Sequence, residues 1–229
     1  MAAPVIKKES LQFLKTLSKN NNREWFLKHK GQYDIARENM IGFANALLIA
    51  MEKHDKIETA SGKDSMYRIY RDTRFSKDKT PYHNFWNGGF MRATKALRGS
   101  YYFRIQPGAS FIGGGFWGPN TEDMKRIRED IDVNYDDWRK ILRQKTFVNT
   151  FGELYGEQLT TAPRGYAKDH PAIDLLRYKQ FVMRHHFTDE EVLSGNFVAL
   201  ANDGFKKMRP FLNYMSEVLT TDANGELII

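Results

Sequence analysis

Basic side chains crowd the segment between residues 66 and 82, and their chemistry suits an anionic ligand. The cations of this segment are Arg68, Arg71, Arg74, Lys77 and Lys79. The hydroxyl groups of Thr73, Ser76 and Thr80 lie between them. Guanidinium forks and ammonium groups beside hydroxyls are the donors that phosphates and carboxylates require. The segment therefore predicts a binding site for a phosphorylated or carboxylated ligand, on a binding protein or on an enzyme. The alternative interpretation is a solvated basic loop between two strands, which is what most charge runs are.

Three neighbouring groups join this predicted site. Asp72 is placed to orient an arginine or to act as a base. Tyr82 ends the segment after Pro81, and Arg104 belongs to a predicted strand in which it shares a face with Tyr102. Because alternate residues of a strand face opposite ways, we expect only some of the cations to converge.

A second polar segment, residues 163–171, offers complementary chemistry. Arg164, Asp169 and His170 supply a fork-shaped donor, a carboxylate and a group that titrates near neutrality. The alternative interpretation is a proline-punctuated surface connection. We predict that residues 71–82 and 163–171 meet around one cleft, since titratable groups cluster at functional sites.

Glycines lie in the predicted strands near this cleft, at Gly88–Gly89 and Gly113–Gly115. They are expected to leave a floor without side chains on which a ligand lies. Residues 113–118 match the letters of the dinucleotide-binding pattern G-x-G-x-x-G, but that fingerprint needs a following parallel strand. The pattern instead predicts a glycine-rich strand that packs closely against another part of the chain.

Metal and cofactor sites are not predicted. The chain has no cysteine, and its six histidines lack the spacing of metal ligands. A formal charge of +7 on 229 residues favours acidic partners. We expect an anionic small molecule in preference to nucleic acid.

The alternative function is a non-enzymatic interaction module that meets RNA, DNA or an acidic protein. Aromatic residues interleave with the cations and could stack on bases; they are Tyr67, Tyr70, Phe75 and Tyr82. The absence of cysteine suits a reducing cytosol, and the first residues lack a signal-peptide core. The longest apolar run, residues 43–51, is too short to span a bilayer. We expect a cytoplasmic protein without a membrane segment.

Hydrophobic periodicity predicts which elements position these groups. Helices are expected at residues 10–17, 33–51, 120–151 and 196–219, with Pro210 kinking or splitting the last. Strands are expected at residues 84–92, 101–105, 110–117 and 181–187. Short strands joined by short turns favour an antiparallel meander. The chain is predicted to be a single α+β domain of residues 1–229, with a mostly antiparallel sheet packed against helices from the N- and C-terminal parts.

Several segments together resemble one family of bacterial and fungal proteins, domain of unknown function 2461. They are Asn22–Phe26, Arg71–Tyr82, Tyr101–Tyr102 with Pro107–Gly108, Gly113–Gly114, and Pro163–Tyr166 with Asp169–Pro171. The resemblance covers nearly the whole chain and implies a single soluble α+β domain. It transfers no catalytic residues. In that family a lysine often follows the tyrosine at position 82, where this chain has His83.

Overall fold

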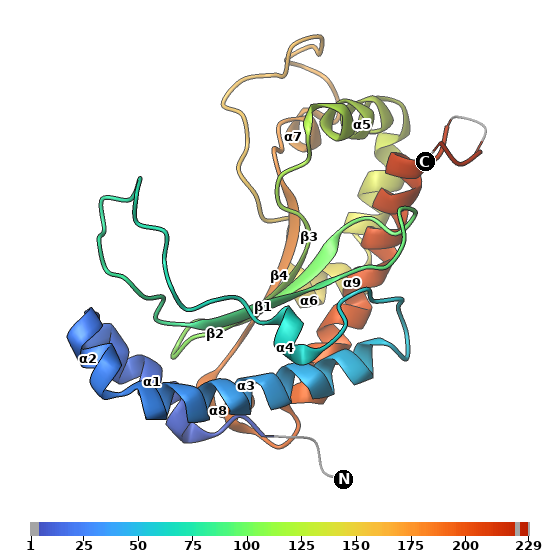
Figure 1. Cartoon of the computed structure of the whole chain (residues 1–229). Helices are drawn as coiled ribbons and strands as arrows, with labels where there is room; N and C mark the ends of the chain where they lie inside the picture. Colours follow the sequence, from blue (N-terminus) through green and yellow to red (C-terminus); the bar gives the residue numbers. More distant parts are fainter. Residues whose placement is uncertain (1–4, 223–224, 229) are drawn as a thin grey trace. The chain divides into compact units, whose positions relative to one another are not determined.

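Four strands pair in sequence order and form an antiparallel meander (Figure 1). The computed structural model describes residues 5–222 and 225–228. The strands are β1 (Trp86–Met91), β2 (Ser100–Ile105), β3 (Ser110–Phe116) and β4 (Phe181–Phe187). The predicted sheet and its strand order are therefore confirmed.

Helices precede, interrupt and follow this sheet in the sequence, which confirms the α+β class. Before β1 the chain forms α1 (Lys8–Lys19), α2 (Arg23–Lys28), α3 (Lys30–Met51) and α4 (Gly62–Ser65). Between β3 and β4 it forms α5 (Thr121–Leu142), α6 (Lys145–Phe151) and α7 (Ile173–Leu176). After β4 come α8 (Asp189–Leu193) and α9 (Phe197–Thr220). Pro210 lies inside α9 and does not split it.

The chain divides into two compact units that each draw on several segments. Unit 1 consists of Met1–Met91, Tyr102–Ile112 and His186–Asp203. Unit 2 consists of Arg92–Tyr101, Gly113–His185 and Gly204–Ile229. The single domain of residues 1–229 stays a prediction.

The core of unit 1 lies between its helices and one face of β1 and β2. The predicted apolar stripe of α3 is buried from Tyr33 to Met51, and α3 contacts α1, α2, α4 and β1. The ring centroids of Phe43 and Phe103 lie 5.5 Å apart, and those of Phe13 and Trp86 lie 5.9 Å apart. Burial of these large rings fixes which face of the strands points inward, since aromatic side chains dominate core energetics.

The core of unit 2 centres on Trp138 of α5, whose side chain is fully buried. Its ring centroid lies 5.7 Å from that of Phe181, and its indole N–H donates to the Asp130 carboxylate over 2.6 Å. The Tyr214 hydroxyl donates to the same carboxylate oxygen over 3.0 Å. Burial, and then the nearby Asp130 charge, raise the pKa of Tyr214. The α5 backbone departs from helical geometry at Asn134, so its two halves are joined at a kink.

Gly88 and Gly115 serve packing, and the expectation that they form a floor for a ligand is wrong for these two residues; for Gly89 and Gly113 it stays a prediction. A side chain on Gly88 would meet Phe103 and the Ser65 carbonyl oxygen within 2.7 Å. Gly115 has φ +132°, and a Cβ there would lie 2.1 Å from the carbonyl oxygen of Phe181. Protein atoms already occupy that space. The alternative prediction, a glycine-rich strand packed closely against another part of the chain, is confirmed.

A helix can cross a membrane only if it is long and apolar enough. Within residues 5–222 and 225–228, no helix combines the length and the apolar character needed to cross a bilayer.

Candidate functional site

The basic segment forms a hairpin that leads into β1 in unit 1. Residues 66–71 pair with residues 81–88, as isolated antiparallel bridges join Met66 to Gly88 and Tyr70 to Tyr82. The His83 N–H donates to the Ile69 carbonyl over 2.8 Å. We call these paired residues the hairpin stem and residues 72–80 the tip loop; Figure 1 draws both in teal.

Arg71, the stem residue next to the tip loop, holds that loop together. Arg71 Nη1 donates to the Asp78 carboxylate and to both oxygens of Thr80. The Thr80 backbone N–H donates to Asp78 over 2.9 Å. This backbone bond first, and then the Arg71 guanidinium, lower the pKa of Asp78 to about 2. Carboxylates that accept such hydrogen bonds stay ionised.

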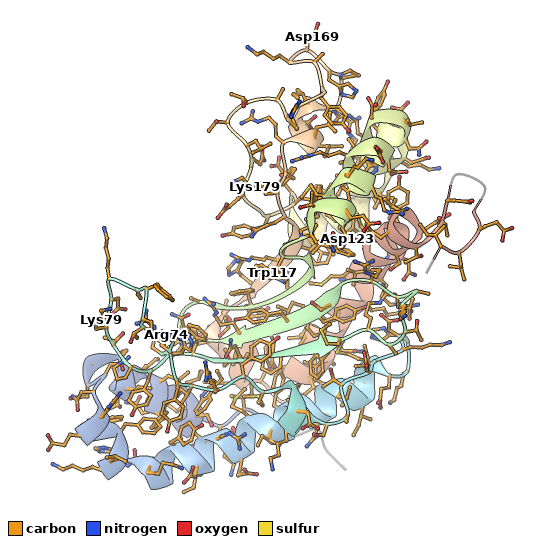
Figure 2. The ribbon with its side chains drawn as sticks, turned by 45° about the horizontal axis from the view of Figure 1, so that its top comes forward. Arg74, Lys79, Trp117, Asp123, Asp169 and Lys179 are labelled. Carbon is orange, nitrogen blue, oxygen red and sulfur yellow. The ribbon has the colours of Figure 1, made fainter. Side chains whose placement is uncertain are left out.

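Two cations of the tip loop itself are also paired within it. The Arg74 guanidinium lies against the Asp72 carboxylate, with Nε donating over 3.0 Å and Nη2 over 2.6 Å. This pairing lowers the pKa of Asp72. Lys79 Nζ donates to the Thr73 carbonyl over 2.9 Å, and Figure 2 shows Arg74 and Lys79 on this loop. These bonds favour the interpretation of the tip as a self-paired loop.

A different group of charges lies at the base of the hairpin. The ring centroids of His83 and Phe85 are 4.6 Å apart, and the Arg104 guanidinium lies 3.9 Å from the Phe85 centroid. Phe85 therefore contacts both an imidazole and a guanidinium. Together with Arg71, which acts electrostatically on His83, these residues form what we call the Arg104 cluster: Arg71, His83, Phe85 and Arg104.

Arg104 is held in place by aromatic contacts and by one hydrogen bond. Its guanidinium lies 3.9 Å from the Phe85 centroid and 5.3 Å from that of Phe111. Its Nε donates to the Tyr102 hydroxyl over 3.2 Å. Across residues 5–222 and 225–228, no acceptor binds its two terminal nitrogens and no carboxylate pairs with it. Arg104 is thus a positioned, partly exposed donor fork.

The pKa of His83 depends on its burial and on the charges around it. Burial is the largest cause that lowers its pKa, followed by the positive charges of Arg71, Arg104 and Arg68. An imidazole in such surroundings is neutral near pH 7. The cluster therefore combines guanidinium groups with a neutral base.

Planar side chains continue from this cluster across the same face of unit 1. We call Tyr67, Tyr102, Phe111 and His186 the aromatic row. Successive ring centroids along the row are 6.3, 5.6 and 5.5 Å apart. The intervening β2 residues Phe103 and Ile105 are fully buried, so β2 turns Tyr102 and Arg104 away from the core of unit 1.

The other predicted site residues have varied surroundings. Arg68 and Lys77 are exposed, and neither has a salt bridge or side-chain hydrogen bond in the described part of the chain. Tyr82 is 4% exposed and stacks on Phe26 at 4.1 Å. Its ring belongs to the core of unit 1, so we leave it out of the site proposed below.

The second polar segment, residues 163–171, belongs to unit 2. His170 Nε2 lies 2.9 Å from the Asp132 carboxylate, and its Nδ1 accepts from the Ala172 N–H. The imidazole thus ties the loop to α5 and α7. Arg164 and Asp169 are exposed, and Figure 2 shows Asp169 at the outer end of this loop. That residues 71–82 and 163–171 share one cleft stays a prediction.

Comparison with known proteins places the chain in a family. The family model described as "Conserved hypothetical protein (DUF2461)" matches residues 9–214. The chain belongs to this family. No curated protein and no solved structure matches it.

Sequence reasoning missed His83, Phe85, Phe111 and His186, although one signal was available. His83, Phe85 and Asn87 alternate along the segment that enters β1, as Tyr102 and Arg104 do along β2. The Asn87 amide donates to the Tyr102 hydroxyl over 3.3 Å. Matching the alternation on two adjacent strands would have put these side chains on one face. Within the described ranges, no group of three or more His, Asp or Glu residues is placed to hold a metal ion.

Proposed function

We propose that unit 1 binds a small molecule carrying a phosphate or carboxylate group at the Arg104 cluster. The observation that carries this proposal is the guanidinium of Arg104. It is fixed between two aromatic rings, and its terminal nitrogens lack acceptors in the described residues. Planar guanidinium forks match carboxylate and phosphate oxygens in geometry.

The Arg104 cluster suits this role better than the tip loop. Arg74 and Lys79 would have to give up bonds inside the tip loop before they could bind a ligand. Arg104 would not have to break such a bond. Arg71 uses only Nη1 to hold Asp78 and Thr80, so its other nitrogens are left to bind a ligand. A preorganised donor binds at a lower cost in conformational entropy.

The remaining predicted cations support the cluster from a distance. The charge of Arg68 acts on His83, and Lys77 and Lys79 add positive potential at the tip loop. Such fields raise the association rate of an anion. A contribution of Arg164, Asp169 and His170 to the same ligand stays a prediction. If the ligand is a substrate, neutral His83 is the group of this cluster suited to accept a proton.

The test replaces Arg104 and measures binding of phosphorylated and carboxylated metabolites by thermal shift. A ligand at a hundredfold its dissociation constant stabilises the wild-type protein by about 2.7 kcal/mol. Arg104→Met keeps an unbranched side chain between Phe85 and Phe111 but removes the charge. We predict that it abolishes the shift, and that Arg74→Met, which removes a cation paired with Asp72, preserves it. Absence of any shift across the library, or an unchanged shift in Arg104→Met, would refute the proposal.

One observation favours a second function, a nucleic-acid interaction module. Phe75 of the tip loop is 96% exposed, and Arg74 lies 5.8 Å from its ring centroid. Tyr67 and Tyr70 are about half exposed, at 52% and 50%. An exposed aromatic ring among cations is the arrangement with which proteins stack single-stranded bases.

Oligonucleotide binding separates the two functions. If the tip loop binds single strands, Phe75→Ala should weaken binding of a short single-stranded oligonucleotide by about tenfold. Affinity should also fall steeply between roughly 50 and roughly 200 mM salt. Arg104→Met should change this binding little, because Arg104 is not part of the tip loop. No binding at low salt would eliminate this function.

A further inference from the structure

The aromatic row indicates which chemical group is joined to the phosphate or carboxylate of the ligand. Tyr67 stands at one end of the row with half of its surface exposed, and His186 stands exposed at the other. Between them Tyr102 is partly exposed and Phe111 is buried. The exposed half of Tyr67, at the end of a row that turns away from the core of its own unit, offers a flat ring surface to a ligand.

The row adjoins the proposed anion site directly. The Tyr102 hydroxyl accepts from Arg104 Nε over 3.2 Å, and the same guanidinium lies 5.3 Å from the Phe111 centroid. Tyr67 is the next ring, 6.3 Å from Tyr102. A ligand that holds its anionic group at Arg104 therefore needs only a short link to bring another group over Tyr67.

We infer that the ligand bound at the Arg104 cluster is an aryl compound, whose phosphate or carboxylate is joined to a flat aromatic ring that stacks on Tyr67. This inference rests on the proposed function and specifies its ligand. Stacking between rings and cation–π contact with Arg104 favour a planar π-system over a puckered saturated ring of the same size.

Two matched ligand pairs test the inference. Phenyl phosphate is compared with cyclohexyl phosphate, and benzoate with cyclohexanecarboxylate, so that each pair shares its anion and differs in ring planarity. Inorganic phosphate serves as the ligand without a ring. Dissociation constants come from NMR chemical-shift titrations at constant ionic strength. In the wild-type protein we expect the aromatic member of at least one pair to bind about tenfold more tightly than its saturated counterpart.

The chain offers a well-matched control variant. Tyr67 and Tyr70 lie on the same strand of the hairpin stem and are equally exposed. However, Tyr70 turns toward Phe26 and Tyr82, at centroid distances of 6.0 and 5.3 Å. Tyr67→Leu should abolish the preference for the flat ring and leave phosphate affinity unchanged, whereas Tyr70→Leu should retain the preference. Circular dichroism checks folding, and Tyr67→Gln replaces Tyr67→Leu if that variant fails to fold.

The outcomes separate this inference from the proposed function. Equal affinity for both members of both pairs, or a preference that survives in Tyr67→Leu, would overturn the inference. Phosphate binding that is lost in Arg104→Met would still support the anion site in that case. If none of the five ligands binds, both the inference and the proposed function fail.

Discussion

At the scale of single residues, the cations of the hairpin and of neighbouring β2 are of two kinds. Arg71, Arg74 and Lys79 bond to acceptors within the hairpin. Arg104 instead contacts two rings, and its terminal nitrogens bind no acceptor in the described residues. Surface ion pairs contribute little stability, so the loop pairs mainly order the loop. Arg104 has no carboxylate partner in the described residues, so its charge, fixed in position by the two rings, is available to a ligand.

His83 makes the proposed binding pH-dependent. Its pKa in the folded protein is lowered, first by burial and then by arginine charges. Stability from the neutral imidazole is therefore fully present above the ordinary value of 6.5 and is lost as pH falls through the folded pKa. An anion bound among the arginines offsets their charge, so we predict that ligand raises the pKa of His83.

The measurement is an NMR titration of the His83 ring with and without phosphate. By linkage, affinity should increase as pH falls below 6.5, about tenfold for each unit by which the bound anion raises this pKa. His54, which bonds to Asn202 over 2.9 Å, is not part of the Arg104 cluster, so phosphate added at constant pH should leave its backbone amide resonance unshifted. A His83 pKa that phosphate leaves unchanged would contradict the prediction.

At the scale of elements, β2 was predictable because its apolar residues alternate, and the other strands because they are short runs separated by turns. The long helices were predictable because their apolar residues recur every three or four positions. The face of β2 that carries Tyr102 and Arg104 followed from the same alternation. The pairing inside the tip loop did not, because it depends on backbone turns that bring Asp78 back to Arg71. The sequence shows that many charged residues lie in this segment, but it does not show which cation pairs with which carboxylate.

Gly115 of β3 offers a test of this element's packing. Its φ is +132°, and a Cβ at this position would lie 2.1 Å from the carbonyl oxygen of Phe181, so strain and collision both exclude a side chain. We predict that Gly115→Ala destabilises the protein by roughly 3 kcal/mol, as strain combined with a backbone clash does. Gly108 also has positive φ, at +73°, but open space around it, so Gly108→Ala should cost only about 1 kcal/mol. Chemical denaturation measures both, and similar values for the two variants would contradict this explanation.

At the scale of the whole molecule, the division into two units follows no linker. The chain passes from one unit to the other within β2, β3, β4 and α9. Domain boundaries ordinarily fall in exposed, flexible connections. The single domain of residues 1–229 stays a prediction. Sequence patterns could predict the elements and the fold class, but a division that cuts through strands leaves no mark in local composition.

The prediction that residues 71–82 and 163–171 share a cleft belongs to this scale. The chain has no cysteine, so Lys77→Cys with Arg164→Cys accepts two spin labels at defined positions. We predict one narrow, short distance distribution that ligand sharpens further. Lys77→Cys with Lys28→Cys, both within unit 1, calibrates the position of the tip loop itself. A broad or long distribution for the first pair would end the single-cleft hypothesis.

The self-paired tip loop has a consequence for how this segment changes through evolution. Each of its pairs joins two positions only a few residues apart, 72 with 74 and 71 with 78. If one partner is replaced, the charge of the other is left unpaired. A substitution at one position therefore favours a compensating substitution at the position with which it pairs. Among relatives these positions should be inherited as couples, while His83 and Arg104 should vary with the ligand that each relative recognises.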